Sequence, residues 1–521
     1  MAGTSVFETH ISTLFFTADR VFKLLKPVCN SFLDHRSISV RVEAAQRELD
    51  LNRRIAPDVY LGLADVVEHD ELVDRMIVMR RLSAELSLTS FIERGELTRD
   101  LLRSVARSVA VFHAGLEPIH DPNGPGSASV QRKNWEDSFA ELDRFVGQIL
   151  DPTTNDRIVA LATAYLDGHP QLFDERIVDG HIVDGHGDLL ADDIFCLDDG
   201  PRILDCLAFR DDLRIGDVLS DIGFLAMDLH RLAGPKAASE LIAAYDEFTG
   251  EQHPGSLAHH YVAYRAHVRC KVAALRWEQG APEFGAVARM YHRLTLDQLE
   301  RSRTRLVLVG GGPGAGKTTI ASRVAEHYGW PVLSSDPVRK DLEGVERLSR
   351  AVAKPDEGIY TAAASDATYA ELLRQTELLL DAGQSVVIDA SWSKERYRVA
   401  ARKLAASHIV ELVEIDCTID PTIARERVAR RLADGWSPSD ATPEIVDHMK
   451  NSSDRWNEAT SLDTSQPVGQ NVRQAIEIVA GSACNDEQST QWPRSDFWGA
   501  FIASSGRFAT AQRSQSSHRR K

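Results

Sequence analysis

The most constraining feature of this sequence is an eight-residue stretch, GGPGAGKT (residues 311–318), which one glycine, Gly310, separates from a continuous apolar run, Leu306–Val309. It matches the pattern G-x-x-x-x-G-K-[S/T], and a helix-forming segment, Thr319–Tyr328, comes next. Glycines let the backbone wrap tightly, so that several N–H groups point at phosphate oxygens, and the N-terminus of the following helix adds favourable charge. In such a loop the lysine reaches the β- and γ-phosphates, and the threonine hydroxyl reaches Mg²⁺. The sequence therefore predicts a nucleoside triphosphate site formed by Gly311, Gly312, Pro313, Gly314, Ala315, Gly316, Lys317, Thr318 and Thr319.

Two carboxylates follow later strands of the same region. Asp336 comes after the short strand-like run Pro331–Leu333, with Arg339 three residues further on, and Asp389 ends the apolar run Val386–Ile388. Strands that alternate with helical segments predict a parallel α/β sheet. In such sheets, carboxylates at the carboxyl ends of strands project into the crevice that binds ligand. Helix capping is the alternative interpretation of both aspartates.

The residues of this region resemble those of small-molecule and polynucleotide P-loop kinases over about residues 304 to 480. The resemblance implies that Asp336 is the catalytic base, that Arg339 binds the acceptor, and that Asp389 organises Mg²⁺ or water. It also implies an arginine-bearing lid, which spreads charge away from the transferring phosphoryl group. A solvated basic helix face is the alternative for the lid candidates Arg425, Arg427, Arg430 and Arg431.

A second constellation lies in the first part of the chain. The sequence His186-Gly187-Asp188 is followed by Asp193, and Asp205 ends an apolar run further on. Protein-kinase-like enzymes use a histidine, an aspartate base and a Mg²⁺ ligand five residues after that base. Upstream, a strand-like run carries Lys23 and the next helical segment carries Glu48. In kinases such a pair orients the α- and β-phosphates.

This region, about residues 8 to 300, resembles aminoglycoside and choline phosphotransferases. The resemblance implies that Asp188 is the catalytic base, that Asp193 and Asp205 bind Mg²⁺, and that Lys23 and Glu48 bind the nucleotide. For Asp217 and Asp221, which complete the pattern, we expect a structural role as caps of the next helix.

Two departures from that family pattern leave an alternative open. Asp193 stands where the family usually carries asparagine, which adds negative charge at the metal position. No G-x-G-x-x-G loop lies near residues 9–15, and the N-terminal sheet looks short. The first part is therefore either an active kinase-like domain or a degenerate one kept for binding or regulation.

The order of the two regions resembles bacterial bifunctional proteins that fuse an aminoglycoside-phosphotransferase-like domain to a P-loop kinase domain. With 521 residues, the chain is long enough for two to four domains. We expect an α+β protein-kinase-like domain at 1–302, an α/β P-loop kinase domain with a parallel sheet at 303–481, and a disordered tail at 482–521, which is rich in Ser, Gln and Arg.

Composition excludes several other classes. The formal net charge of -17 argues against a general nucleic-acid or anionic-membrane binder. The six cysteines are scattered, which suggests neither a disulfide framework nor a zinc site. No signal peptide and no apolar run long enough to cross a membrane are visible, so we expect a cytoplasmic protein.

The sequence as a whole thus predicts an ATP- and Mg²⁺-dependent phosphotransferase with two nucleotide sites, acting on a hydroxyl of a small molecule. Two alternatives stay open: a P-loop kinase governed by an inactive N-terminal pseudokinase, and a nucleotide-gated binding protein. Neither a nucleic-acid nor a membrane partner is expected. The sequence does not identify the acceptor or the oligomeric state.

Overall fold

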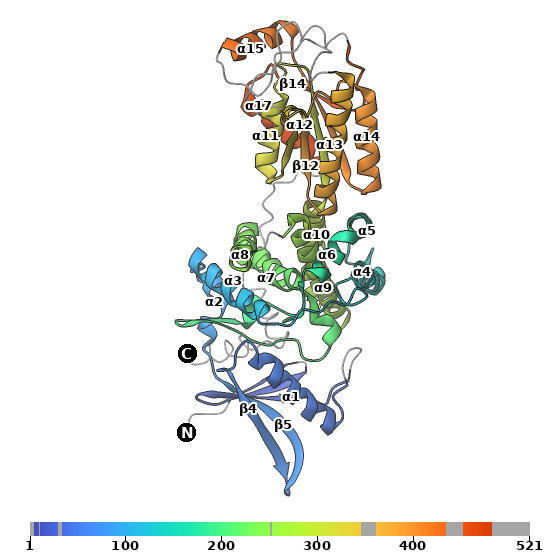
Figure 1. Ribbon diagram of the computed structural model, residues 1–521. Coiled ribbons are helices and arrows are strands. Elements are labelled where there is room, and N and C mark those ends of the chain that lie inside the picture. Colours follow the sequence, from blue (N-terminus) through green and yellow to red (C-terminus); the bar gives the residue numbers. More distant parts are fainter. Residues whose placement is uncertain are drawn as a thin grey trace.

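The computed structural model describes residues 5–9, 11–29, 34–250, 253–344, 361–433 and 452–481. Figure 1 shows three bodies in a row: a sheet with one long helix, a central helical body, and a second sheet flanked by helices at the far end. The first two bodies belong to the kinase-like part and the third carries the phosphate loop. The predicted tail after residue 481 lies outside the described residues.

The N-terminal body is a five-stranded antiparallel sheet in the order β1-β2-β3-β5-β4. Buried and half-buried residues alternate along β2 and β3, because successive side chains of a strand point to opposite faces. The buried face packs against Ala45 and Leu49 of α1. This sheet is larger than the short one that we expected. Its elements are β1 (Ser5–Glu8), β2 (Ser12–Phe16), β3 (Arg20–Leu25), α1 (Ile38–Arg53), β4 (Tyr60–Glu68) and β5 (Glu71–Arg80).

The central body is mainly helical and holds the largest hydrophobic core of the described residues. Two small antiparallel ribbons, β6 with β9 and β7 with β8, lie on it and carry the kinase-like motifs. The helices are α2 (Leu88–Glu93), α3 (Arg99–Ala114), α4 (Ala128–Leu142), α5 (Pro152–Gly168), α6 (Pro170–Val178), α7 (Val218–Ala233), α8 (Pro235–Thr249), α9 (Gly255–Glu278) and α10 (Phe284–Ser302). The ribbon strands are β6 (Ile182–Asp184), β7 (Ile194–Leu197), β8 (Gly200–Ile203) and β9 (Ile215–Asp217).

The third body is a parallel five-stranded sheet in the order β11-β12-β10-β13-β14. Every residue of β10 is buried, as expected for a strand covered on both faces. Its elements are β10 (Arg305–Gly310), α11 (Lys317–Tyr328), β11 (Val332–Ser334), α12 (Ser335–Leu342), α13 (Ala362–Asp381), β12 (Val386–Asp389), α14 (Glu395–Ser407), β13 (Glu411–Thr418), α15 (Pro421–Ala433), β14 (Thr460–Asp463) and α17 (Val468–Ala480).

Only two residues, 303 and 304, separate α10 from β10. At this junction Thr304 Oγ1 lies 2.9 Å from His169 Nε2, and Ser256 Oγ donates to the carbonyl of Gly383 over 2.6 Å. The amino ends of the parallel strands therefore face the helical body. Their carboxyl ends, and with them the phosphate loop, point away from it (Figure 1).

These observations confirm the predicted fold classes: a kinase-like first part and a parallel-sheet phosphate-loop domain. Among the described residues, no helix combines the length and the apolar character needed to cross a membrane.

Candidate active sites in the two halves

The phosphate loop joins the buried strand β10 to the first turn of α11, so its geometry is fixed from both ends. Gly314 has φ 80°, and a Cβ at this position would come within 2.6 Å of the carbonyl oxygen of Ala424. Only glycine fits that approach. Within the described part of the chain, the amides of Gly314, Gly316 and Lys317 find no protein acceptor. Such amides at a helix N-terminus are suited to phosphate oxygens.

The outside of the loop is held by other elements. Thr464 Oγ1 donates to the carbonyl of Ala315 over 2.7 Å. Arg427 of α15 donates to the carbonyls of Gly314 (3.4 Å) and Thr464 (3.0 Å). Among the lid candidates whose side chains the structure describes, Arg427 contacts the loop, whereas Arg425 and Arg430 are exposed. The side chain of Arg431 lies outside the part of the chain that the structure describes.

Asp389 is buried at the end of β12, between β10 and β11. Its Oδ2 accepts hydrogen bonds from Thr318 (2.8 Å) and from Ser334 (2.9 Å). Its Oδ1 is buried and finds no hydrogen-bond partner among the described residues. Since α14 begins only at Glu395, Asp389 does not cap that helix.

This cluster fits Mg²⁺. The metal prefers oxygen ligands and usually binds through one or two carboxylates together with waters and substrate phosphates. The hydroxyl of Thr318 and the unpartnered Oδ1 of Asp389 supply such oxygens beside the phosphate loop. No three His, Cys, Asp or Glu side chains gather as a protein-only metal cage in the described ranges.

Asp336 lies in the first turn of α12, not at its N-cap, which is Ser334. Arg339 Nη1 donates to Asp336 Oδ1 over 3.3 Å, so the predicted base and the predicted acceptor-binding residue are in contact. The side chain of Asp336 is one-third exposed, whereas that of Arg339 is mostly buried. Thr319 is exposed in the first turn of α11.

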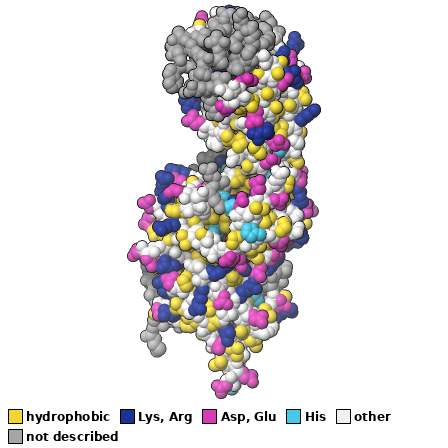
Figure 2. All heavy atoms as spheres, viewed as in Figure 1, with side chains coloured by type: hydrophobic (Ala, Val, Ile, Leu, Met, Phe, Trp, Pro, Cys, Tyr) yellow, Lys and Arg dark blue, Asp and Glu magenta, His cyan; other side chains and the backbone are white. Residues whose placement is uncertain are grey.

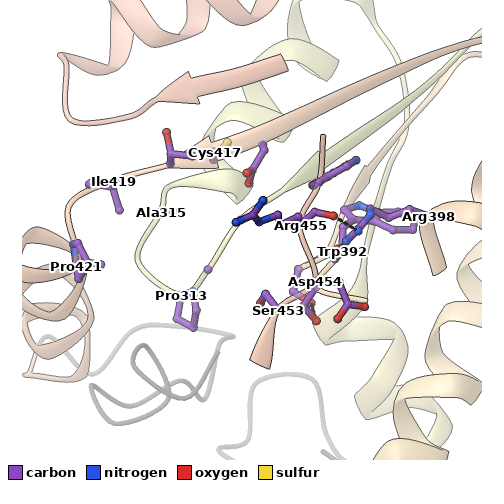
Figure 3. Close-up of a pocket in the computed structure, with 18 residues that line it drawn as sticks. Pro313, Ala315, Trp392, Arg398, Cys417, Ile419, Pro421, Ser453, Asp454 and Arg455 are labelled. Atoms are coloured by element: carbon purple, nitrogen blue, oxygen red, sulfur yellow. Dashed lines mark hydrogen bonds between the residues drawn. The ribbon is translucent and has the colours of Figure 1, made fainter. Parts of the chain in front are cut away.

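A cavity of about 440 Å³, which was not predicted from the sequence, lies beside the phosphate loop. It is lined by Gly311–Pro313, by the segments after β12 and β13, and by residues 453–456 (Figure 3). Arg398, Arg455 and two tryptophans contribute to its wall. In the sequence, the adjacent basic and aromatic residues Arg455 and Trp456 were the available signal of this cavity. Arg398, which donates to the carbonyl of Arg455, lies 57 residues away in the chain.

In the first half, Lys23 of β3 lies between two carboxylates. Its Nζ is 2.7 Å from Glu48 Oε1 of α1 and 3.0 Å from Asp205 Oδ1. Burial alone would lower the pKa of Lys23, but Asp205 and Glu48 outweigh it and hold that pKa well above its ordinary value. The pKa of Glu48 is raised by burial, against the opposing effect of Lys23. The three residues predicted from distant parts of the sequence therefore meet.

Asp205 has φ 64°, a left-handed conformation that is uncommon for a residue other than glycine. Its amide donates to Tyr60 Oη over 3.2 Å. The amide of Leu204 donates to the carbonyl of Asp193 over 2.9 Å, which places the two predicted Mg²⁺ ligands on adjacent segments. Both are carboxylates, and their oxygens suit Mg²⁺.

The loop that carries Asp188 is held by Asp221 of α7. Asp221 accepts the amides of His186 (2.6 Å) and Gly187 (2.8 Å) and lies 3.2 Å from His113 Nε2. The expectation that Asp221 caps a helix is therefore wrong, because its oxygens bind this loop. Asp217 does cap α7, through the amide of Leu219.

His186 is buried, and burial lowers its pKa. Its Nε2 lies 3.0 Å from the carbonyl of Leu204, and because a carbonyl only accepts, Nε2 carries the proton. His186 thereby ties the loop of Asp188 to the segment of Asp205. At the β1–β2 turn, where a glycine-rich loop is missing, Thr9 Oγ1 instead closes the turn by accepting the amide of Ser12.

The family described as AAA domain matches residues 306–455. The uncharacterized protein Rv2004c of Mycobacterium tuberculosis is 36% identical over 475 residues, covering 90% of this chain and 94% of that protein.

Among solved structures, a gluconokinase from Sinorhizobium meliloti is 20% identical and covers 34% of this chain and 91% of its own, with a TM-score of 0.25. A choline/ethanolamine kinase family protein from Mesorhizobium loti is 13% identical and covers 57% of this chain and 92% of its own, with a TM-score of 0.35.

Proposed function

We infer that this chain, which belongs to the same family as the uncharacterized mycobacterial protein, is an ATP- and Mg²⁺-dependent phosphotransferase acting on a hydroxyl of a small molecule. The observation that carries the proposal is the contact of Asp389 with Thr318, beside loop amides that lack protein acceptors. A glycine-rich turn with a purely structural role would need no buried carboxylate at this position.

In the second half, Lys317 and the loop amides would hold the phosphates of ATP, and Arg339 would position the acceptor. Asp336 would take the proton of the acceptor hydroxyl. The acceptor oxygen would then bond to the γ-phosphorus as the bond between that phosphorus and the ADP oxygen breaks. Thr318 and Asp389 would hold Mg²⁺, which neutralises charge on the β- and γ-phosphate oxygens.

In the first half, we propose a second nucleotide site. Lys23, oriented by Glu48, would contact the α- and β-phosphates, and Asp188 would act as the base. Asp193 and Asp205 would hold Mg²⁺. The contacts that join the segments of these residues support this assignment.

The pseudokinase alternative also has an observation in its favour. In the described structure Thr9 and Ser12 form a closed turn where a kinase needs a phosphate-covering loop. A first half of this kind would bind nucleotide without transferring phosphate.

The test is a metabolite screen with radiolabelled ATP on the full chain and on two variants, Lys317→Ala and Asp188→Asn. We expect label transfer to small hydroxylated compounds, and Lys317→Ala should reduce the transfer by the second half at least a hundredfold while leaving that by the first half. Unchanged transfer in Asp188→Asn would favour the pseudokinase alternative. If no metabolite is labelled above background hydrolysis, the protein is a nucleotide-gated binding protein instead.

Acidic and basic side chains are interspersed over the face shown in Figure 2, and with a net charge of -17 we propose no nucleic-acid partner.

We propose a cytoplasmic location, where ATP is available, and domains at 1–302 and 303–481. The short connection between α10 and β10 supports the boundary.

A further inference from the structure

The cavity beside the phosphate loop is a built site. It opens where the carboxyl ends of β12, β10 and β13 lie side by side, next to Gly311–Pro313. Trp456 packs directly on the end of β10, since a Cβ on Gly310 would lie 2.2 Å from its ring. The indole N–H of Trp456 donates to the buried carboxylate of Glu414, which also pairs with Arg402. The wall of the cavity is therefore fixed in place.

Two residues that line the cavity each carry a buried donor that finds no acceptor in the described part of the chain. Trp392 and Arg398 are fully buried, yet Trp392 Nε1 and Arg398 Nε have no hydrogen-bond partner among the described residues. The two Nη groups of Arg398 are used, because they donate over 2.6 Å each to the carbonyls of Trp392 and Arg455. Both orphaned groups are N–H donors only, so a ligand that satisfies them must present acceptor oxygens.

The charge of the cavity points the same way. Figure 3 shows the guanidinium of Arg455 directed toward the phosphate loop, and no carboxylate pairs with it within the described ranges. Asp454 is already used, since its Oδ2 accepts the amide of Glu395. Asp416 remains as the opposing charge, and burial raises its pKa while Arg398 lowers it. Two guanidinium groups thus face one available carboxylate.

We propose that this cavity binds an oxyanion carried by the acceptor, a carboxylate, phosphate or sulfate group, through the N–H groups of Trp392, Arg398 and Arg455. This inference rests on the proposed kinase function of the second half and specifies its substrate class. The cavity adjoins the phosphate loop, because Gly311–Pro313 and Ala315 line it, but neither Lys317 nor Thr318 does. The oxyanion would therefore lie beside the phosphates of ATP.

The experiment uses the full chain saturated with a non-hydrolysable ATP analogue and Mg²⁺, so that the phosphate loop is filled. Sodium phosphate is then titrated at constant ionic strength, and binding is followed by calorimetry and tryptophan fluorescence. Glycerol 3-phosphate and glycerate are compared with neutral glycerol in the same way. We expect saturable binding of the anions and none of glycerol.

Two variants locate the bound anion. Trp392→Phe removes one orphaned N–H, and Arg455→Gln removes an exposed guanidinium. Neither change touches the donors of Arg398, whose replacement would also break two carbonyl contacts. Each variant should weaken phosphate binding at least about tenfold, because it removes a hydrogen bond to a charged group. The matched control is Arg374→Gln, an exposed arginine of α13 paired with Glu371, which should bind phosphate as the parent does.

The inference is overturned if the analogue-loaded chain shows no saturable phosphate binding. It is also overturned if both variants bind phosphate like the control, or if phosphate displaces the analogue and so occupies the loop itself. Failure of the kinase proposal is seen separately, as absence of analogue binding to the parent protein. Phosphate titration of the unloaded chain, with the same variants, still tests the cavity in that case.

Discussion

Replacing Lys23 by methionine tests the kinase-like half most sharply, because it leaves the buried carboxylate of Glu48 without its positive partner. The side chains of Lys23 and Glu48 are 10% and 8% exposed, and Asp205 is 32% exposed. Removing one partner of a buried ion pair costs about 3–5 kcal/mol, since the other charge stays buried without compensation. Unfolding entropy is about 2.1 cal/mol/K per residue, so for about 300 residues this loss lowers the midpoint by about 5–8 °C.

The loss should depend on pH. The folded-state pKa of Lys23 is raised, so its contribution is fully present below the ordinary lysine value and is lost only as pH rises through the raised one. The pKa of Glu48 is also raised, and a raised carboxyl pKa costs stability as pH rises through it. Without Lys23, the pKa of Glu48 rises further, because Lys23 opposes the effect of burial, and the cost to stability at high pH grows. The deficit of Lys23→Met should therefore be larger at pH 8 than at pH 5.

Differential scanning calorimetry measures these effects, and the transition of the phosphate-loop domain serves as the internal reference. The control is the double variant Lys23→Met/Glu48→Leu, which removes both charges and should regain most of the lost stability. The reasoning is refuted if the stability losses of Lys23→Met and Glu48→Leu, measured singly, add up in the double variant. It is also refuted if the stability loss of Lys23→Met is the same at both pH values.

Three further predictions concern single contacts. Asp389→Asn should lower turnover by the second half by about a hundredfold, with a much smaller change in nucleotide affinity. Steady-state kinetics measures both quantities, and an equal loss in turnover and in affinity would contradict the prediction. Asp221→Asn turns one acceptor oxygen into a donor facing the amides of the Asp188 loop, so the first calorimetric transition should lose about 1–3 kcal/mol; an unchanged transition would contradict the holding role. Gly310→Ala should cost the second domain about 1–3 kcal/mol by overpacking, and adding Trp456→Leu should relieve it; no relief would show that the clash is elsewhere.

The sequence predicted the features that depend on a fixed local spacing. The phosphate loop is one of them, because its glycines, lysine and threonine must follow one another for the backbone to wrap around a phosphate. Lys23, Glu48 and Asp205 are far apart in the sequence, and they were predicted from their order along the chain, which resembles that of phosphotransferases; the structure brings the three together.

Features made by distant residues could not be predicted in the same way. The cavity depends on Arg398 reaching the carbonyl of Arg455, a contact that no local pattern encodes. Asp221 was expected to cap a helix because it lies in a first turn, and only the fold shows the amides that it binds instead. The N-terminal sheet was expected to be short, whereas pairing with β4 extends β5 over Glu71–Arg80.

The central claim, that the chain carries two nucleotide sites, is tested most directly by the stoichiometry of ATP-analogue binding in the presence of Mg²⁺. Isothermal titration of the full chain should show two equivalents, and Lys317→Ala and Lys23→Met should each retain one. One equivalent in the parent, lost in Lys317→Ala, would leave the second half as the single nucleotide binder. No binding by the parent, with or without Mg²⁺, would contradict the account altogether.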